Sequence, residues 1–270
     1  MSDRFTTFDV REVVTESSII KSFYLSPRTP LARDFVAGEY LIFEHLSETG
    51  EAVRREYSIS GARGDDLRVT IKRKAAPKVG VPDGVLSTHF HDVIRAGDTV
   101  KAGGPMGAFT LDRTTDNPVV LLSGGVGLTP VVAMAHELAG TTRETVFVHA
   151  CENGEVHALG REMRKLAADH ANLSTHTLYR APTDADQLGR DYDTKGVITR
   201  ELLEGLTPRI PAEFYLCGPS PFMTAMYDIL LEMGADPDKI SYEFFGPATL
   251  LKPKKTTPSK PAATGGPVIT

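Results

Sequence analysis

The 270-residue sequence contains only two cysteines, Cys151 and Cys217. Two thiols are too few to hold an iron–sulfur cluster or a structural zinc ion, and a chain of this length needs no disulfide framework. The spacing of His89-Phe-His91 could suit a metal ion, but no third ligand and no HExxH-type pattern accompany it. We therefore expect no metal site, and any cofactor must be organic or belong to another protein.

Long apolar runs and an excess of positive charge are also missing. No run of about 18 apolar residues occurs, and the start, Met1-Ser-Asp-Arg-Phe-Thr-Thr7, lacks the basic and apolar segments of a signal peptide. The formal net charge of -5 provides no basic field to attract nucleic acid or an anionic membrane. We expect a cytoplasmic monomer with neither of these partners.

The remaining composition is that of a soluble globular protein, with 41% hydrophobic and 24% charged residues. A chain of this length can form two domains of about 100 to 150 residues, each with its own core.

Short β-type runs fill the first part of the chain, separated by the turn-forming residues Gly, Pro, Asp and Ser. In Leu67-Arg-Val-Thr-Ile-Lys72 an apolar residue occupies every second position, as in a half-buried antiparallel strand. We predict an antiparallel β-barrel over residues 1–113, with one helix near Leu86–Ile94. The expected strands are Thr7–Val14, Ile19–Leu25, Tyr40–Phe43, Glu56–Ser60 and Leu67–Lys72.

Strands and helices alternate after Pro118. Val119-Val-Leu-Leu122 is wholly apolar, which is typical of a parallel strand buried on both faces. The pattern predicts a doubly wound α/β domain over residues 114–250, with ligands bound at the carboxyl ends of its strands. The other expected strands are Thr145–His149, Leu173–Tyr179 and Phe214–Cys217, and the expected helices are Pro130–Leu138, His157–His170 and Pro221–Met233.

Residues 251–270 are rich in proline and lysine and could not bury a core, so we interpret them as a linker or tail. The β-type residues at the end, Val268-Ile-Thr270, raise the hypothesis that another domain begins there; a natural disordered tail has the same composition.

The strongest motif is Ser123-Gly-Gly-Val-Gly-Leu-Thr-Pro130, which follows a buried strand and opens a helix. Glycines let a backbone approach a pyrophosphate closely, and a helix N-terminus offers free amides. The spacing departs from the usual dinucleotide fingerprint, and a tight turn without a ligand would look similar.

A second motif, Tyr215-Leu-Cys-Gly-Pro-Ser-Pro-Phe-Met223, ends another apolar strand. The topology of a parallel sheet could bring it to the same crevice, where Cys217 and Gly218 could line a flat ring without crowding it. A buried structural cysteine before a turn is the alternative.

Arg55-Glu-Tyr-Ser58 in the first domain combines groups that could neutralise a phosphate, cover an isoalloxazine ring and hydrogen-bond to it. The period of a strand places Arg55 and Tyr57 on one face and Ser58 on the other. Gly84-Val-Leu-Ser87 precedes the expected helix and could seat a diphosphate on its backbone amides and the Ser87 side chain.

These four motifs resemble, in order and spacing, the ferredoxin-NADP reductase superfamily over residues 5 to 250. The chain is most similar to the reductase half of bacterial flavohaemoglobins, because His149-Ala-Cys-Glu-Asn-Gly-Glu-Val-His-Ala158, Phe214-Tyr-Leu-Cys-Gly-Pro219 and Tyr242-Glu-Phe-Phe-Gly-Pro247 look like stretches of that group. No globin precedes the barrel, so we expect no oxygen or nitric oxide chemistry in this chain alone.

The resemblance implies an FAD in the barrel, with FMN as the alternative, and an NAD(P)H site in the α/β domain. Arg55 would contact the flavin phosphate, Phe245 would cover the flavin face where nicotinamide arrives, and Glu243 would tune the flavin. The residues expected to bind cofactors are Arg55, Glu56, Tyr57, Ser58, Gly84, Val85, Leu86, Ser87, Gly124, Gly125, Gly127, Thr129, Pro130, Glu152, Cys217, Gly218, Pro219 and Phe245. Those expected at the reacting atoms are Ser58, Cys217, Glu243 and Phe245. His136 is expected on a helix surface and not as a base, since hydride transfer needs none.

The choice of coenzyme depends on the end of the second strand of the α/β domain, where an arginine usually receives a 2'-phosphate. Here the strand ends at His149-Ala-Cys-Glu-Asn153, with Glu152 and no basic residue adjacent in the sequence. A carboxylate repels a phosphate and accepts a bond from a ribose hydroxyl, so NADH is favoured over NADPH.

The expected reaction is the passage of a hydride from NADH to flavin and then of electrons to a partner: a [2Fe-2S] ferredoxin, a globin or an oxygenase. A diaphorase acting on small acceptors, or a non-catalytic flavoprotein that docks to a complex, is the alternative.

Overall fold

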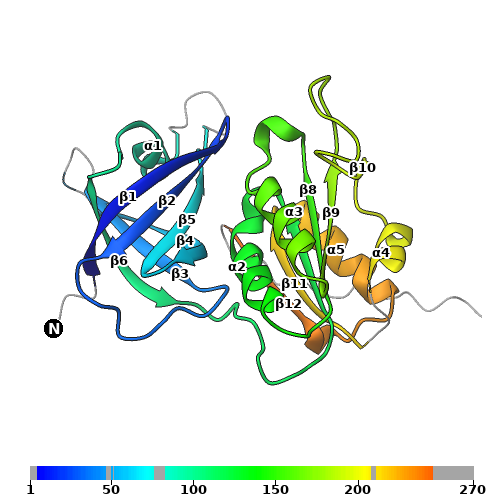
Figure 1. The fold of residues 1–270 in the computed structure, drawn as a ribbon. Coiled ribbons are helices and arrows are strands. Elements are labelled where there is room, and N and C mark those ends of the chain that lie inside the picture. The colour runs from blue at the N-terminus through cyan, green and yellow to red at the C-terminus, as the bar shows by residue number, and fades with distance from the viewer. Residues whose placement is uncertain (1–4, 47–49, 51, 76–82, 208–210, 246–270) are drawn as a thin grey trace, which may run out of the picture.

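The computed structural model describes residues 5–46, 50, 52–75, 83–207 and 211–245. In this part of the chain a β-barrel and an α/β domain lie side by side (Figure 1). The predicted fold class is therefore confirmed. The domain boundary that we propose, between residues 113 and 114, falls in the connection between the last barrel strand and the first strand of the second sheet. The proposed tail, residues 251–270, lies outside the described residues, as do residues 246–250.

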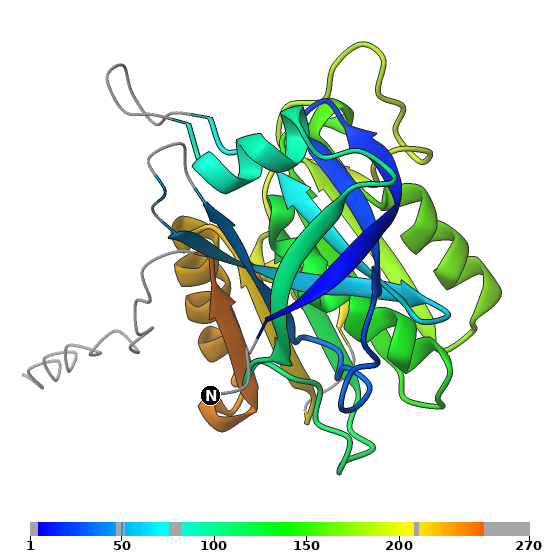
Figure 2. The ribbon, with the colours of Figure 1, turned by 90° about the vertical axis from the view of Figure 1, so that its left-hand side faces the viewer.

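The barrel is closed by six antiparallel strands in the order β1-β2-β5-β4-β3-β6. Its interior is aromatic, and the helix α1 (Val85–Asp92) closes one end, as Figure 2 shows from the barrel side. Phe90 of α1 packs edge-on against Phe23 and Phe43, with ring centroids 5.0 and 5.2 Å apart. The strands are β1 (Phe5–Ser17), β2 (Ile20–Pro27), β3 (Tyr40–Leu46), β4 (Ala52–Arg63), β5 (Asp66–Lys72) and β6 (Thr99–Met106).

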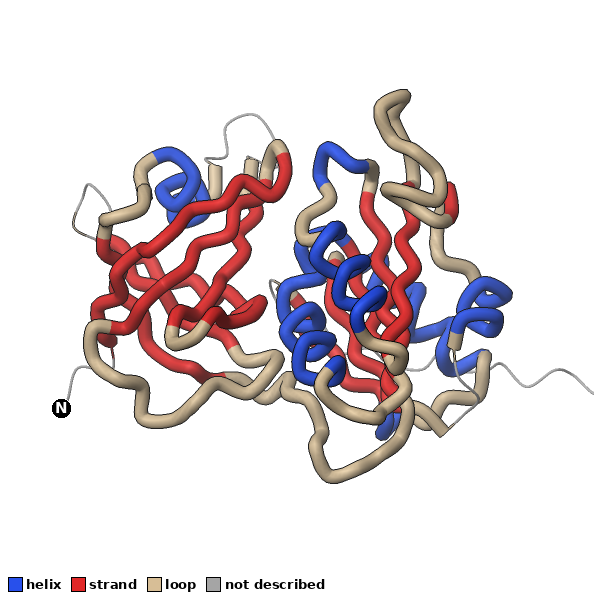
Figure 3. The backbone as a smooth tube through the Cα atoms, in the orientation of Figure 1, coloured by secondary structure: helices blue, strands red, loops and turns tan. Residues whose placement is uncertain are grey.

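The second domain is a sheet of six parallel strands in the order β10-β9-β8-β7-β11-β12. Helices cover both faces, α2 and α3 on the barrel side and α4 and α5 on the other (Figures 1 and 3). The strands are β7 (Val119–Gly124), β8 (Thr145–Cys151), β9 (Leu173–Tyr179), β10 (Thr194–Lys195), β11 (Glu213–Gly218) and β12 (Ile240–Phe244). The helices are α2 (Leu128–Ala139), α3 (Gly160–Asp169), α4 (Arg200–Leu206) and α5 (Ser220–Glu232).

The apolar strand β7 is buried on both faces, as its sequence predicted. Val119 and Leu121 belong to the core beneath α2 and α3, whereas Val120 and Leu122 belong to the core beneath α4 and α5. Each face buries two branched side chains, and each such burial is worth about 1.5–3 kcal/mol.

Four elements have no counterpart among the sequence-based predictions: β6, β10, α4 and β12. In β6, Gly103, Gly104 and Pro105 are poor strand formers; Gly103 pairs with both β1 and β3, and Gly104 and Pro105 lie at a register shift before Met106 pairs with β3 again. Pairing with a neighbour therefore overrode the local preference.

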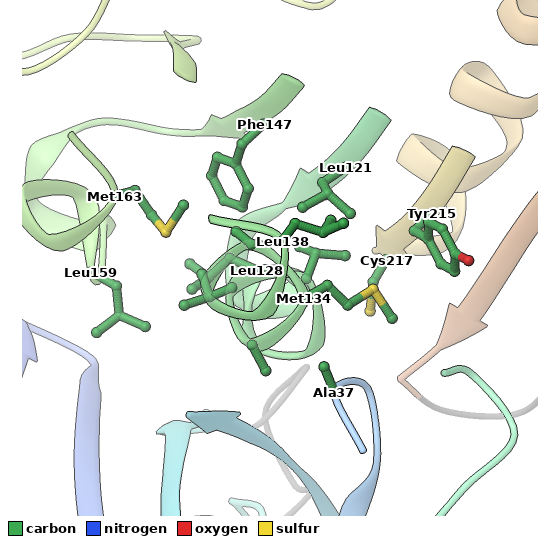
Figure 4. Packing of buried hydrophobic residues seen from close by; sticks show 14 of the residues in the cluster. Ala37, Leu121, Leu128, Met134, Leu138, Phe147, Leu159, Met163, Tyr215 and Cys217 are labelled. Carbon is green, nitrogen blue, oxygen red and sulfur yellow. The ribbon is translucent and has the colours of Figure 1, made fainter. Parts of the chain in front are cut away.

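Helix α2 forms the contact between the domains, since it packs against β4 of the barrel. Figure 4 looks along α2 and shows Ala37, from the segment before β3, close to Met134 of the helix. Gly38 permits this approach: it adopts a φ of +104°, and an added Cβ would lie 1.9 Å from the carbonyl oxygen of Phe109 and 2.7 Å from Met134 Cε. Among the helices in the described ranges, none has the length and apolar character needed to cross a bilayer.

Candidate functional site

Three neighbouring strands of the second sheet bring their carboxyl ends together. In the register of the parallel ladders, Cys217 of β11 lies between Ser123 of β7 and Glu243 of β12. Cys217 is completely buried, and Glu243 is half-buried. The expectation that the glycine turn and the Cys217 motif meet at one crevice is thus confirmed by strand pairing.

The turn after β7 requires glycine at three positions for different reasons. An added Cβ at Gly127 would lie 2.2 Å from the carbonyl oxygen of Cys217, and one at Gly124 would lie 2.9 Å from the Phe222 ring. Gly125 has a left-handed φ of +55°, and its absent side chain faces open space. The turn is therefore pressed against β11 on one side and open on the other, where a ligand could approach the backbone.

Two helices begin at this crevice. The first turn of α2 has no capping side chain, and Thr129, which is buried, donates its hydroxyl to the carbonyl of Val126 at 3.3 Å. Helix α5 begins after Pro219 and also lacks a side-chain cap. The N–H of Leu128, the first residue of α2, is bonded to the carbonyls of Gly125 and Val126. Helix starts carry partial positive charge, which suits the diphosphate of a dinucleotide. Pro130 lies in the first turn of α2, where it costs no hydrogen bond.

A buried hydrogen bond supports the turn from behind. Ser123 Oγ and His149 Nδ1 are 2.8 Å apart, and both residues are almost fully buried. Burial lowers the pKa of His149 well below its usual value, so the ring is neutral.

The barrel motif lies on β4, the strand that faces α2. Arg55 and Glu56 are exposed, whereas Tyr57 is half-buried and packs against Phe43 and Phe90 at ring-centroid distances of 5.8 Å. Ser58 is only 4% exposed. Because the next residue, Ile59, belongs to the barrel core, alternation turns Ser58 to the opposite face, toward the α/β domain.

The start of α1 forms the second anion seat that the sequence suggested. Ser87 donates its hydroxyl to the carbonyl of Gly84 at 2.9 Å and accepts a bond from the N–H of Lys74 at 3.2 Å. The Ser87 hydroxyl is thus already bonded within the protein. Of the donors expected to hold a diphosphate here, the backbone N–H groups remain. The first N–H groups of the helix, those of Val85, Leu86 and Ser87, are the available donors.

Glu243 is the most perturbed carboxyl group at the crevice. Burial, together with the nearby charge of Glu56, raises the pKa of Glu243 to about 7. Its Oε2 is buried and has no hydrogen-bond partner among the described residues. Burial and these two carboxylates also raise the pKa of Tyr40, which pairs with Ser58 across β3 and β4. Tyr40 therefore belongs to the site, although no sequence motif marked it.

Phe245, the last described residue, is 45% exposed directly after β12. The structure thus brings Cys217 and Glu243 together on adjacent strands and places Glu56 of β4 near Glu243, whereas Phe245 is partly exposed.

The coenzyme-selecting end of β8 differs from the sequence-based expectation. Arg180, directly after β9, donates Nε to Glu152 Oε2 at 2.7 Å, and the two backbones are joined by bonds from Arg180 N to Cys151 O and from Ala181 N to Glu152 O. The inference that Glu152 has no basic neighbour is therefore wrong: none is adjacent in the sequence, but Arg180 lies beside Glu152 in the folded structure. The signal was present in the sequence, because adjacent parallel strands end at one edge of a sheet.

Comparison with known proteins supports both halves of the site. An oxidoreductase FAD-binding domain model matches residues 6–111, and an oxidoreductase NAD-binding domain model matches residues 121–228. The flavohemoprotein of Bacillus thuringiensis subsp. konkukian is 36% identical over 254 residues, which are 92% of this chain and 62% of that protein. The chain thus spans about three fifths of the curated relatives that it matches.

Solved structures agree. The flavohem-like FAD/NAD-binding domain of nitric oxide dioxygenase from Vibrio cholerae superposes with a TM-score of 0.75 at 32% identity, covering 90% of this chain and 99% of that one. The Amycolatopsis cytochrome P450 reductase superposes with a TM-score of 0.74 at 26% identity, covering 91% of this chain and 71% of that one.

Proposed function

This chain belongs to the family of FAD- and NAD-binding oxidoreductases that includes the flavohem-like reductase domains, and we propose that it oxidises NADH and passes the electrons to a separate redox protein. As an NAD(P)H-dependent flavoprotein reductase it needs two cofactor seats that face each other. The observation that carries the proposal is the joint position of three features: β7, β11 and β12 end side by side, α2 starts at that edge and packs against β4, and Glu56 of β4 lies near Glu243 of β12.

The described residues fit an FAD. The free amides of α1 would hold its diphosphate, Arg55 would neutralise a phosphate, and Ser58 would hydrogen-bond to the ring. Bound there, FAD supplies the chemistry of accepting a hydride and releasing electrons singly. FMN remains the alternative, since the phosphate nearest the ring is common to both.

The glycine turn and the starts of α2 and α5 would hold the dinucleotide. Gly125 leaves room for its diphosphate, and the wall of Cys217 and Gly218 excludes water without crowding a flat nicotinamide ring. Phe245 would occupy the nicotinamide position until NADH displaces it. The residues of this chain would thus bind and orient the dinucleotide, and their contribution to catalysis would be to position the reacting atoms.

Glu243 would hold a proton beside the reacting ring. With a pKa near 7, it exchanges that proton readily at neutral pH, when charge on the flavin changes.

NADH is the proposed coenzyme because Glu152 offers a carboxylate to a ribose hydroxyl. The pairing of Arg180 with Glu152 neutralises part of the repulsion that a 2'-phosphate would meet. We therefore propose a preference for NADH over NADPH of modest size.

The acceptor is proposed to be a globin, a [2Fe-2S] ferredoxin or an oxygenase component. Related proteins carry names of this kind: flavohemoproteins, a P450 reductase and, for the fold alone, a ferredoxin reductase of a carbazole dioxygenase. A diaphorase that reduces small acceptors is the second candidate.

The test is an anaerobic titration of the FAD-loaded protein with NADH while the flavin absorbance is recorded. Rapid bleaching is expected, and dithionite, which needs no nicotinamide site, is the control reductant. Flavin that dithionite bleaches but that both NADH and NADPH leave oxidised would reject the reductase and favour a docking flavoprotein.

A further inference from the structure

A buried ionic bridge joins the two domains at a distance from the cofactor seats. Arg68 of β5 reaches Glu162 of α3 with two bonds, from Nη1 to Oε2 at 2.5 Å and from Nη2 to Oε1 at 2.7 Å. His136 of α2 contacts the same Oε1 through Nε2 at 2.6 Å. One carboxylate is thus held by a residue of the barrel and a residue of the neighbouring helix.

The guanidinium of Arg68 is fixed on the barrel side as well. It donates from Nη2 to the carbonyl of Ser60 at 2.8 Å and from Nε to Ser60 Oγ at 3.1 Å, and its side chain is only 5% exposed. Gly61 leaves space for it, because an added Cβ there would lie 3.1 Å from Nη2. Burial alone would raise the pKa of Glu162, but the bonds from His136 and Arg68 outweigh it and hold the pKa at about 2. The bridge is therefore charged at neutral pH.

The packing around the bridge is open. A cleft of about 460 Å³ lies beside it, between Tyr24 and Phe35 on the barrel side and His136 and Glu137 on the helix side. Apolar packing is interrupted at this part of the interface, so the spacing of the domains here depends on the polar contact.

Both ends of the bridge connect directly to the cofactor seats. Ser60 lies two residues beyond Ser58 on β4, and His136 lies on α2, the helix that starts at the dinucleotide turn. His136 lies eight positions after Leu128 on α2, which corresponds to about 12 Å along the helix axis. A rigid strand and a rigid helix thus connect the bridge to the two surfaces that must meet for hydride transfer.

We propose that Arg68 and Glu162 are interdomain positioning residues, which set the separation between the dinucleotide turn and Ser58 and so the geometry of hydride transfer. This inference rests on the proposed function and goes beyond it, because neither residue touches a cofactor seat.

The test compares Glu162→Gln with a matched control, Asp193→Asn. Asp193 pairs at 3.2 Å with Arg164, which lies on α3 like Glu162, and it is about as exposed as Glu162, but this pair lies within the α/β domain and does not join the domains. In stopped-flow reduction by NADH, E162Q should lower the limiting rate on the order of 10- to 100-fold, since a displacement of about 1 Å has effects of this size. FAD content and dithionite reduction should not change.

The control should lose thermal stability but keep the limiting rate. Equal losses of rate in E162Q and D193N would mean that stability, and not position, is responsible, and a wild-type rate in folded E162Q would overturn the proposal. R68K keeps the positive charge but cannot make both bonds to Glu162, so its limiting rate should lie between those of wild type and E162Q. If E162Q does not fold, the same comparison is made with R68K.

Small-angle scattering gives a second readout that needs no reaction. E162Q should show a broader distribution of domain separations than wild type and D193N. If wild type is not reduced by NADH or NADPH, the proposed function fails, but the scattering comparison still decides the bridge: identical profiles would reject it.

Discussion

The two proposed cofactor seats are built from different parts of the chain. The proposed dinucleotide seat is mostly backbone: its glycines approach Cys217 and Phe222 closely, and the donors proposed for it are main-chain N–H groups at helix starts. The flavin region on β4 combines a helix start with side chains, of which Arg55 and Glu56 are exposed. A backbone seat has a fixed shape and tolerates no added atoms, whereas a side-chain seat can be altered in charge without a change of shape.

The largest effect is expected where an atom is added to the backbone seat. Gly127→Ala would place a Cβ 2.2 Å from the Cys217 carbonyl and force the turn away from β11. We expect the rate of flavin reduction by NADH to fall at least about 100-fold, and stability to fall by about 1–3 kcal/mol, as for overpacking in a core. Stopped-flow reduction and thermal unfolding measure the two effects. Retention of bound FAD shows that the barrel is intact, and wild-type kinetics would contradict the close contact.

A substitution in the side-chain seat should weaken FAD binding without changing the fold. Arg55→Ala removes a charged hydrogen bond, typically worth about 1.5–3 kcal/mol, so the dissociation constant of FAD should rise roughly 10- to 100-fold. Fluorescence titration of the apoprotein with FAD measures it, and Arg54→Ala is the matched control, because Arg54 is paired with Glu44. If both variants bind FAD equally well, Arg55 is not a phosphate ligand.

A smaller effect is expected at the ion pair of Glu152 and Arg180, at the ends of β8 and β9. Glu152→Gln removes the carboxylate that holds Arg180 and leaves that arginine free for a 2'-phosphate. The ratio of kcat/KM for NADPH to that for NADH should rise roughly 10-fold, the effect of one charged contact. Arg180→Gln should lower the ratio, and an unchanged ratio in both variants would place coenzyme selection elsewhere.

The smallest effect is on the pH dependence of stability. Glu243 has a pKa raised from 4.5 to about 7, so between these values the folded protein binds a proton that the unfolded chain releases. The contribution of Glu243 to stability must then fall as pH rises from about 4.5 to about 7 and level off above it. The difference in melting temperature between wild-type apoprotein and Glu243→Gln should change across this window. A constant difference would show that the carboxyl group is not perturbed.

Much of this architecture was readable from local pattern. The apolar run of β7, the glycines after it and the alternation in β5 predicted two domains and their fold classes, because burial on one or two faces leaves a period in the sequence. The motif resemblance is confirmed by the matching domain models. The strand β6 escaped prediction because Gly103, Gly104 and Pro105 are poor strand formers, and the pairing of their neighbours with β1 and β3 makes the segment a strand.

Side-chain environments were less predictable. Tyr40 and Arg180 carry no motif: Tyr40 pairs with Ser58 across β3 and β4, and Arg180 meets Glu152 because β8 and β9 end side by side. His136 is on a helix surface, as expected, but there it contacts Glu162 of α3, the same carboxylate that Arg68 of the barrel binds.

The sequence by itself determined what is local: which segments are strands, where glycine is needed for a turn, and which residue types could hold a diphosphate. Tertiary structure decided how those groups are charged and spaced. Glu152 has a partner because β8 and β9 are adjacent, Glu243 has a raised pKa because it is buried near Glu56, and Arg68 meets Glu162 across 94 positions of sequence. The energy of a charged group depends on the solvent and partners around it in space, and these depend on contacts between segments far apart in the sequence.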